Sequence, residues 1–209
     1  MKKTFLAIAL CAFATLSASA EWKIAGDKIR TKWADEVNPS NVLPEYPRPQ
    51  LVRGEWQNLN GLWNYAITNL NSTPSAFEGE ILVPFAIESA LSGVQKKLTE
   101  KQLLWYEREF TIPSKWNSQR IMLHFGAVDW SADVYVNDIL VGSHTGGFTP
   151  FACDITDALN KRGEQKLAVR VWDPTEKGEQ PVGKQLMAGG KIFYTPVSGI
   201  WQTVWLEPV

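Results

Sequence analysis

Carboxylates are the residues of this sequence whose chemistry is most suggestive. Hydrolysis of a glycosidic bond uses two carboxyl groups that flank it, one as proton donor and one as nucleophile or base. Glu107, Glu109, Asp129 and Asp133 lie on or beside predicted strands, and no spacing marks such a pair, so we interpret them as solvated charges. Asp173 differs, because it ends a buried-type strand where a long polar loop begins, and functional residues often project from such loops. The alternative for Asp173 is a simple turn former.

The sequence gives little support to metal or phosphate chemistry. Its only histidines are His124 and His144, and Cys153 is its only cysteine after residue 20, so no cluster has ligand spacing. His124 lies mid-strand opposite the apolar face and is interpreted as a structural histidine. Gly146-Gly147 precedes a predicted strand rather than a helix, and no G-x-S-x-G motif is present. We therefore expect no bound metal and no cofactor.

Charge and composition exclude some partners. The formal net charge is −1 and no block of like charge occurs, which argues against nucleic acid or an acidic membrane surface as a partner. Ten tryptophans are many for 209 residues. They fit a large β core, and the alternative is a set of flat surfaces that stack on sugar rings.

The first twenty residues have the pattern of a bacterial secretory signal. MKKTFLAIALCAFATLSASA contains two lysines, an apolar run and a small-residue end, which predicts cleavage before Glu21. The run is too short for a permanent membrane span, and Leu10 before Cys11 disfavours lipid attachment. We expect a periplasmic or secreted protein without a membrane partner, whose remaining length suits about one domain.

The segment 21–59 is rich in proline, which removes backbone donors and excludes a central strand or a long helix. At most a short helix is predicted before Pro39. From Asn60 onward the apolar period changes to two, which is typical of half-buried antiparallel strands. The predicted strands are 61–67, 79–83, 103–112, 120–125, 130–136, 139–142, 165–172 and 200–206.

Several details of these strands are also predicted. Trp130 is expected in the core together with Val134 and Val136. Asn137-Asp138 is expected to form a tight hairpin turn, and Thr156 or Asp154 is expected to cap a helical turn. No strand–helix–strand rhythm occurs, so the predicted fold is all-β, an antiparallel β-sandwich or jelly roll.

Five stretches of the chain together resemble a known family. In this order they look like the amino-terminal, galactose-binding-like jelly-roll domain of glycoside hydrolase family 2, the family of β-galactosidases, β-glucuronidases and β-mannosidases. The resemblance covers about residues 40–209. The stretches are LNGLW (59–63), LWYEREFTIP (104–113), VDWSADVYVND (128–138), GGFTPFACDITDAL (146–159) and SGIWQTVWLEPV (198–209).

The resemblance implies a domain without catalytic residues. In this family the acid/base glutamate follows an asparagine, and both catalytic glutamates lie on a (β/α)₈ barrel further along, which needs about 250 residues. The present sequence contains no Asn-Glu pair. The expected regions are a signal (1–20), a proline-rich segment (21–59) and the sandwich (60–209), with a domain boundary after it. The implied partners are an immunoglobulin-like domain, the barrel and a β-linked glycoside or oligosaccharide.

The resemblance also suggests where a sugar contact would lie. In some relatives the loop before the last strand of this domain reaches the active site, and by position that loop is 173–199 here. Its candidate substrate-binding residues are Asp173, Lys184, Gln185 and Tyr194. The alternative is that the loop only packs against a neighbouring domain. Two rival functions remain open, a free-standing carbohydrate-binding module and a degenerate gene product that keeps its fold.

Overall fold

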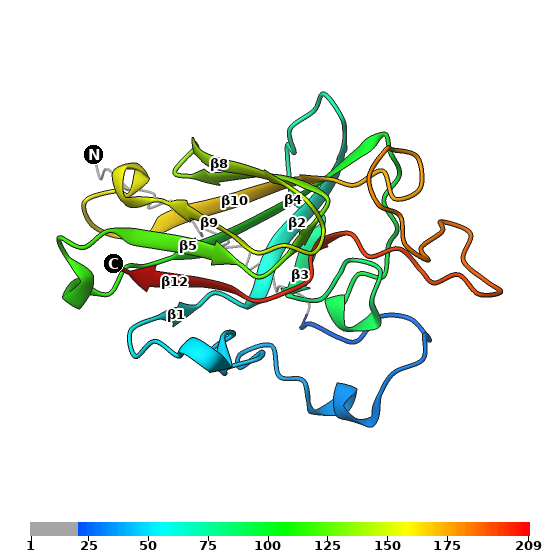
Figure 1. Ribbon diagram of the computed structural model, residues 1–209, viewed down its shortest axis with the longest axis horizontal. Coiled ribbons are helices and arrows are strands. Elements are labelled where there is room, and N and C mark those ends of the chain that lie inside the picture. Colours follow the sequence, from blue (N-terminus) through cyan, green and yellow to red (C-terminus); the bar gives the residue numbers. More distant parts are fainter. Residues whose placement is uncertain (1–20) are drawn as a thin grey trace, which may run out of the picture.

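The alternating segments of the sequence form strands that pack as antiparallel sheets (Figure 1). The computed structural model describes residues 21–209, so the predicted signal at 1–20 lies outside the described residues. One sheet has six strands in the order β3-β2-β4-β10-β7-β8, and the other has four in the order β1-β12-β5-β9. Every strand pair is antiparallel. The predicted all-β sandwich is confirmed.

The strands and helical turns have the following bounds. The six-stranded sheet contains β2 (Gly61–Asn69), β3 (Gly79–Val83), β4 (Gln102–Phe110), β7 (Ser131–Val136), β8 (Ile139–Thr145) and β10 (Gln165–Trp172). The four-stranded sheet contains β1 (Gln57–Asn58), β5 (Ile121–Phe125), β9 (Phe151–Asp154) and β12 (Val204–Pro208). A short ribbon pairs β6 (Val128–Asp129) with β11 (Gly199–Ile200). The 3₁₀ turns are η1 (Lys32–Glu36), η2 (Pro49–Leu51), η3 (Ala90–Ser92), η4 (Ser114–Trp116) and η5 (Thr156–Ala158).

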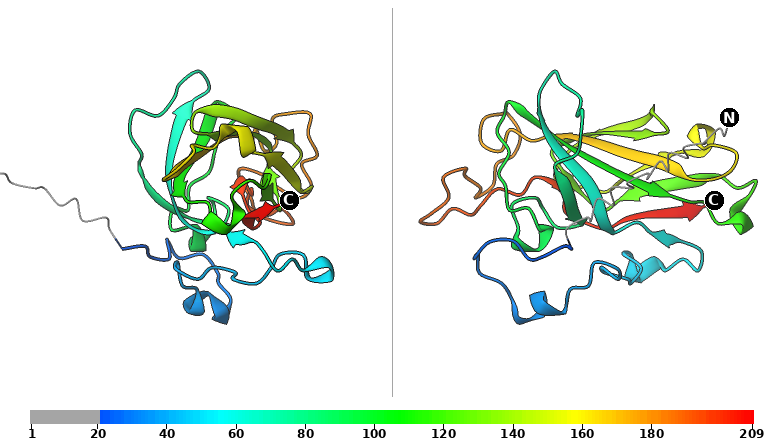
Figure 2. Two further views of the ribbon diagram at one scale, coloured as in Figure 1. Left: turned by 90° about the vertical axis from the view of Figure 1, so that its left-hand side faces the viewer. Right: turned by 180° about the vertical axis from the view of Figure 1, so that it is seen from behind.

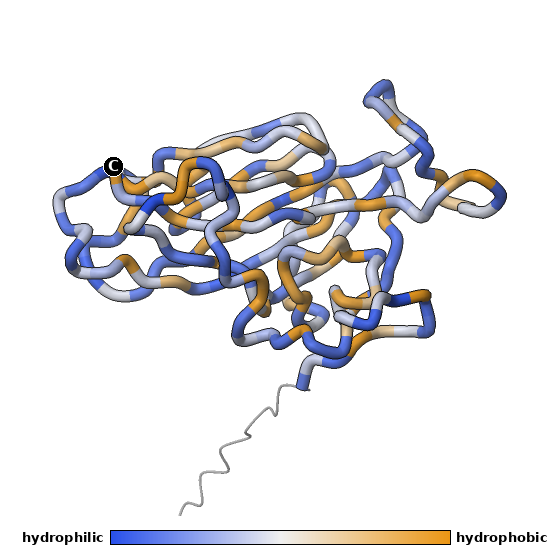
Figure 3. The backbone as a smooth tube through the Cα atoms, turned by 60° about the horizontal axis from the view of Figure 1, so that its bottom comes forward, coloured by the Kyte–Doolittle hydropathy of each residue, from blue (hydrophilic) through white to orange (hydrophobic). Residues whose placement is uncertain are grey.

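The core lies between the sheets, and the end-on view in Figure 2 shows the strands curving around it. Successive side chains of a strand point to opposite faces, so every second residue enters the core. Leu167, Val169 and Val171 of β10 are fully buried in this way, as are Trp63 of β2 and Tyr106 of β4. Hydropathy accordingly alternates along many strands (Figure 3). Burial of these large apolar side chains supplies the main stabilisation of the fold.

Two expectations, that Trp130 lies in the core and that 200–206 forms one strand, are wrong for the same reason. Trp130 is only half-buried, because it lies where the chain passes from the ribbon strand β6 into β7 of the six-stranded sheet. The predicted final strand is similarly divided, since β11 pairs with β6 whereas β12 pairs with β5. Trp201 lies at that crossing and is half-buried, while Trp205 is buried in β12. Alternation of apolar residues in the sequence does not show where the chain passes from one sheet to another.

The proline-rich segment is packed more closely than its composition suggests. Figure 1 shows it running beside β1 and β12, and its last residues form β1, so pairing begins at Gln57 rather than at Asn60. Tyr46 is buried and donates its hydroxyl to Oε1 of Glu207 at 2.6 Å. Arg53 forms an ion pair with the same carboxylate at 3.0 Å. The segment therefore covers the outer side of β12.

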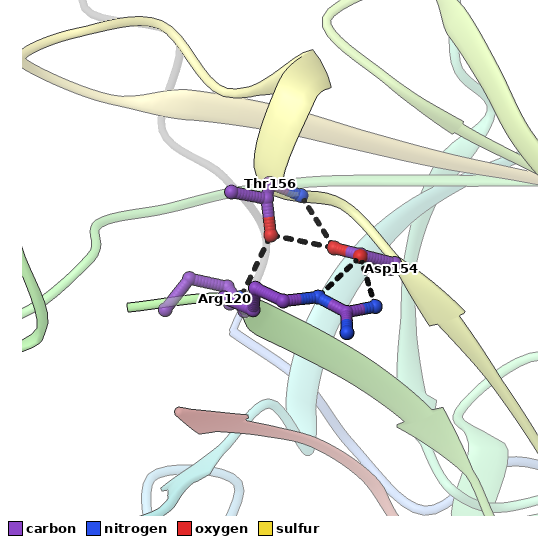
Figure 4. Close-up of polar contacts among 4 residues, drawn as sticks. Arg120, Asp154 and Thr156 are labelled. Atoms are coloured by element: carbon purple, nitrogen blue, oxygen red, sulfur yellow. Dashed lines mark hydrogen bonds and ion pairs between the residues drawn. The ribbon is translucent and has the colours of Figure 1, made fainter. Parts of the chain in front are cut away.

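Two predicted turns can be checked directly. Asn137 and Asp138 have φ values of 50° and 67° and join β7 to β8, as the hairpin prediction requires. At η5 the carboxylate of Asp154 accepts hydrogen bonds from the backbone and the hydroxyl of Thr156, at 3.1 and 2.5 Å, and pairs with Arg120 (Figure 4). These partners lower the pKa of Asp154 to about 2. Asp154 thus fixes the turn, although Ile155 occupies the N-cap position itself.

Candidate functional site

Asp173 follows directly after β10 and is buried, with 3% of its surface exposed. Its Oδ2 accepts a hydrogen bond from the hydroxyl of Ser198 at 2.6 Å, and its Oδ1 accepts one from the backbone N–H of Thr175 at 2.8 Å. Asp173 is thus a turn former at the start of the loop 173–199 and also a link to its far end. One side chain closes the base of the loop.

Two further carboxyl groups are placed at this base by other segments. Glu88 follows β3 along the chain, is 2% exposed, and accepts the backbone N–H of Ser198 at Oε2, at 2.9 Å. Asp129 of β6 is 8% exposed and pairs in register with Gly199 of β11. Glu88, Asp129 and Asp173, which we call the carboxyl cluster, therefore surround the segment Ser198–Gly199.

Burial changes the acidity of all three carboxyl groups. It raises the pKa of Glu88 to about 7 and that of Asp129 to about 7, and the charge of Asp173 adds repulsion in both cases. Burial also raises the pKa of Asp173, although the hydrogen bond from Ser198 opposes the change. Buried carboxyl groups near one another favour a neutral form. The cluster can therefore hold protons at neutral pH, where an exposed carboxyl group is ionised.

Some polar atoms at this base have no partner among the described residues. They are Oε1 of Glu88 and Oγ1 of Thr175, both buried. Buried polar atoms normally form hydrogen bonds, so these two atoms are available to a further donor or acceptor. Within residues 21–209, no group of three or more histidine, cysteine, aspartate or glutamate side chains could hold a metal ion. The chemistry that the base offers is hydrogen bonding and proton exchange.

The other three predicted site residues lie further out on the same loop. The backbone N–H of Tyr194 donates to the carbonyl oxygen of Lys184 at 2.7 Å, so the two sides of the loop are joined there. Gln185 accepts the N–H of Val197 through its side chain at 2.7 Å. Tyr194 is 67% exposed and Lys184 is exposed. The structure brings these three together and leaves Asp173 separately at the base.

The loop projects from one end of the sandwich (Figure 1, orange). Ile192 and Phe193 near its outer end are exposed, and the tube in Figure 3 shows a hydrophobic stretch there. Exposed apolar side chains beside polar ones are typical of a contact surface. The loop thus combines a fixed base with an outer end that is able to contact another domain or another molecule.

The sequence matches the family described as glycosyl hydrolase 2 galactose-binding domain-like over residues 83–192. The chain belongs to this family. The β-galactosidase of Thermoanaerobacter pseudethanolicus is 30% identical over an alignment of 157 residues that covers 72% of this chain and 20% of that protein. The β-glucuronidase of Streptococcus agalactiae is 27% identical over 138 residues, 66% of this chain and 23% of that protein. The resemblance inferred from the motifs is confirmed.

Solved structures show the same fold. A Bifidobacterium dentium β-glucuronidase complexed with coumarin-3-O-glucuronide aligns with a TM-score of 0.57 and 26% identity, over 77% of this chain and 31% of that chain. A Lactobacillus rhamnosus β-glucuronidase aligns with a TM-score of 0.59 and 23% identity, over 78% of this chain and 30% of that chain. The chain therefore spans between a fifth and a third of these relatives.

The match to the galactose-binding-like family includes all three members of the carboxyl cluster, of which sequence reasoning selected one. The interpretation of Asp129 as a solvated charge is wrong, since β6 is covered by β11 and by the Gly146-Gly147 turn. Sequence reasoning does not identify Glu88, whose only sequence signal is that it is a carboxylate within the apolar stretch 83–91.

His124 is structural, since its ring stacks on Trp205 with centroids 4.9 Å apart.

Proposed function

We propose that this galactose-binding-like domain is the non-catalytic part of a family 2 exo-β-glycosidase. In that protein it supports the catalytic (β/α)₈ barrel, adjoins the immunoglobulin-like domain, and forms part of the substrate pocket with the loop 173–199. The observation that carries the proposal is the buried carboxyl cluster that closes the base of this loop. Backbone hydrogen bonds of Tyr194 with Lys184 and Leu186 then join the two sides of the loop further out.

The loop offers two kinds of contact. Its exposed apolar residues Ile192 and Phe193 suit packing against a neighbouring domain. Lys184 and Tyr194 offer a donor and a hydroxyl for sugar oxygens. Such contacts discriminate between substrates, because a missing sugar hydroxyl leaves a buried partner unpaired. Lys184, Gln185 and Tyr194 are thus proposed to contact the substrate. Asp173, whose two oxygen atoms accept hydrogen bonds from Ser198 and Thr175, is proposed to position them from the base of the loop.

The proposed substrate class is a β-linked glycoside or oligosaccharide. The relatives named above as β-galactosidases and β-glucuronidases support the class and leave the sugar open. We also propose that the protein is periplasmic or secreted, and the signal pattern of residues 1–20 supports this. Among residues 21–209 no helix is long and apolar enough to cross a membrane.

Two experiments test the proposal. The purified chain, free of host enzymes, should hydrolyse neither aryl β-galactosides nor aryl β-glucuronides, and turnover would contradict a non-catalytic role. The reading frame beyond codon 209 should continue into a barrel that carries an Asn-Glu pair. A stop codon at that point would instead favour a free-standing carbohydrate-binding module or a degenerate gene product that keeps its fold.

In the continuing polypeptide, replacement of Tyr194 by Phe should lower kcat/KM about tenfold, the equivalent of one hydrogen bond to a sugar. Asp173→Asn should also lower kcat/KM, because it weakens the link to Ser198 that positions the loop. Asp133→Asn, on the outer face of β7, is the control with unchanged kinetics. Thermal melting identifies a variant that has merely lost stability. Unchanged kcat/KM in both loop variants would remove the loop from the site.

A further inference from the structure

A groove of about 670 Å³ lies on the outer face of the six-stranded sheet, well away from the carboxyl cluster. Its floor is formed by β4, β10 and β7, and one wall is formed by the segment 70–77 between β2 and β3. The carboxyl cluster lies beyond the end of β10, whereas the groove lies over the middle of that strand. The volume is in the usual range for small-molecule sites.

The strand register places five lining side chains, together with Asp133 beside them, in two rows. In one row Trp105 of β4 is paired with Arg170 of β10, which is paired with Asp133 of β7. In the other row Glu107 is paired with Ala168, which is paired with Tyr135. Residues two apart on a strand share a face, so all six side chains lie on the outer face. The small Ala168 leaves space between Glu107 and Tyr135.

Two aromatic side chains mark the diagonal of this groove. Trp105 is half-buried, and its Nε1 donates to Oγ1 of Thr68 at 3.0 Å, which fixes the ring. Tyr135 is also half-buried and lies two strands away, which corresponds to about 10 Å across the sheet. Aromatic rings with a polar edge nearby suit a ligand that has apolar faces and hydroxyl groups at its rim.

The charges of the groove indicate which ligand it accepts. Arg170 is neutralised by an ion pair with Asp133, and Lys166 by an ion pair with Asp138 at 2.6 Å. Glu107 is half-buried and forms no ion pair among the residues that the structure describes. The groove therefore has a surplus of negative charge and of hydrogen-bond acceptors, which suits neutral hydroxyl donors and repels an anionic sugar.

We propose that this groove binds a neutral β-linked oligosaccharide, with one sugar stacked on Trp105, another on Tyr135, and hydroxyl groups bonded to Glu107 between them. The separation of the rings requires a ligand longer than a monosaccharide. Such a site would hold a chain-like glycan on the domain independently of the pocket that the loop 173–199 approaches. It goes beyond the proposed function, and either can fail while the other stands.

Calorimetric titration of the 209-residue chain tests the site. The probes are the β-1,4-linked tetrasaccharides of glucose, galactose, mannose and xylose, with β-1,4-linked tetraglucuronate as the anionic counterpart of cellotetraose. At least one neutral tetrasaccharide should bind, and tetraglucuronate should bind at least tenfold more weakly than cellotetraose if cellotetraose is the ligand. Absence of binding by all four neutral probes at millimolar concentration would overturn the proposal, as would preferential binding of tetraglucuronate.

Two variants locate the binding. Tyr135→Ala removes one stacking surface, and Ala168→Tyr fills the groove while leaving every proposed contact residue in place. Each should weaken binding at least tenfold, and thermal melting should show that Ala168→Tyr remains folded. Trp33→Ala, at a 60% exposed tryptophan of η1, should leave binding unchanged, and Tyr194→Ala reports any binding by the loop 173–199.

Binding that survives both groove variants would overturn the proposal. Loss of binding in Tyr194→Ala alone would assign it to the loop 173–199, and would also overturn the proposal. A dimer detected by sedimentation and abolished by Ala168→Tyr would instead assign the groove to a second copy of the chain.

Discussion

Glu88 should make the stability of this domain fall as the pH rises, and Glu88→Gln should remove that contribution. One oxygen of the buried carboxyl group accepts the N–H of Ser198, and the other has no partner among the described residues. Burial and the nearby Asp173 raise its pKa from an ordinary 4.5 to about 7. Glutamine has the same shape and retains an oxygen for Ser198, but it carries no charge at any pH.

The direction in which stability changes with pH follows from the number of protons bound by the folded and unfolded states. Between pH 4.5 and about 7 the unfolded chain has released the proton of Glu88 while the folded chain still holds it. The folded state then binds more protons, so the free energy of unfolding falls as the pH rises. The contribution is complete below pH 4.5 and is lost above pH 7. A pKa difference of about 2.5 corresponds to about 3 kcal/mol.

Urea unfolding followed by tryptophan fluorescence, at constant ionic strength from pH 4 to pH 8, measures this difference. The stability of Glu88→Gln relative to the unmodified chain should increase by about 3 kcal/mol over that range. Glu78→Gln is the control of opposite sign, because the ion pair with Lys96 lowers the pKa of the exposed Glu78. If the free energies of unfolding of Glu88→Gln and of the unmodified chain change in parallel with pH, the reasoning is refuted.

Two further comparisons test the packing of the core. Trp63→Ala should destabilise the domain by about 3–5 kcal/mol, because Trp63 is fully buried, whereas Trp130→Ala should cost clearly less, because Trp130 is half-buried. Equal costs in urea unfolding would contradict this ranking. Gly199→Ala should cost more than Gly163→Ala, since both glycines have positive φ but only at Gly199 would a Cβ collide with a hydroxyl, that of Tyr106. Similar melting temperatures for the two variants would refute the predicted collision.

Much of the fold could be predicted because the alternation of apolar and polar residues along a strand shows which of its two faces is buried. Leu167, Val169 and Val171 alternate with polar residues, and the structure buries all three. The hairpin at Asn137-Asp138 was likewise evident from two residues that tolerate positive φ. The prediction failed at Trp130 and in the final strand, because a change of sheet depends on partners that are distant in sequence.

The carboxyl cluster could be predicted only in part. Asp173 was selected because it follows a buried strand at the start of a long loop, which is a local signal. Glu88 and Asp129 become buried because they pack against Ser198 and Gly199, which lie more than 60 residues further along the chain. Lys184, Gln185 and Tyr194 are brought together by the loop, and their contact with a sugar stays a prediction.

The carboxyl cluster is difficult to explain by stability alone. Three buried carboxyl groups with raised pKa values weaken the folded state at neutral pH, and apolar or amide side chains of similar shape would avoid this loss. Two oxygen atoms at the same place that find no partner within residues 21–209 add to this loss. Perturbed carboxyl groups of this kind concentrate at functional sites, where a ligand or a neighbouring domain supplies the missing partners. If Glu88→Gln stabilises the isolated domain at pH 8, then the acid is present for a purpose other than folding, and the loop that it anchors is where that purpose should be sought.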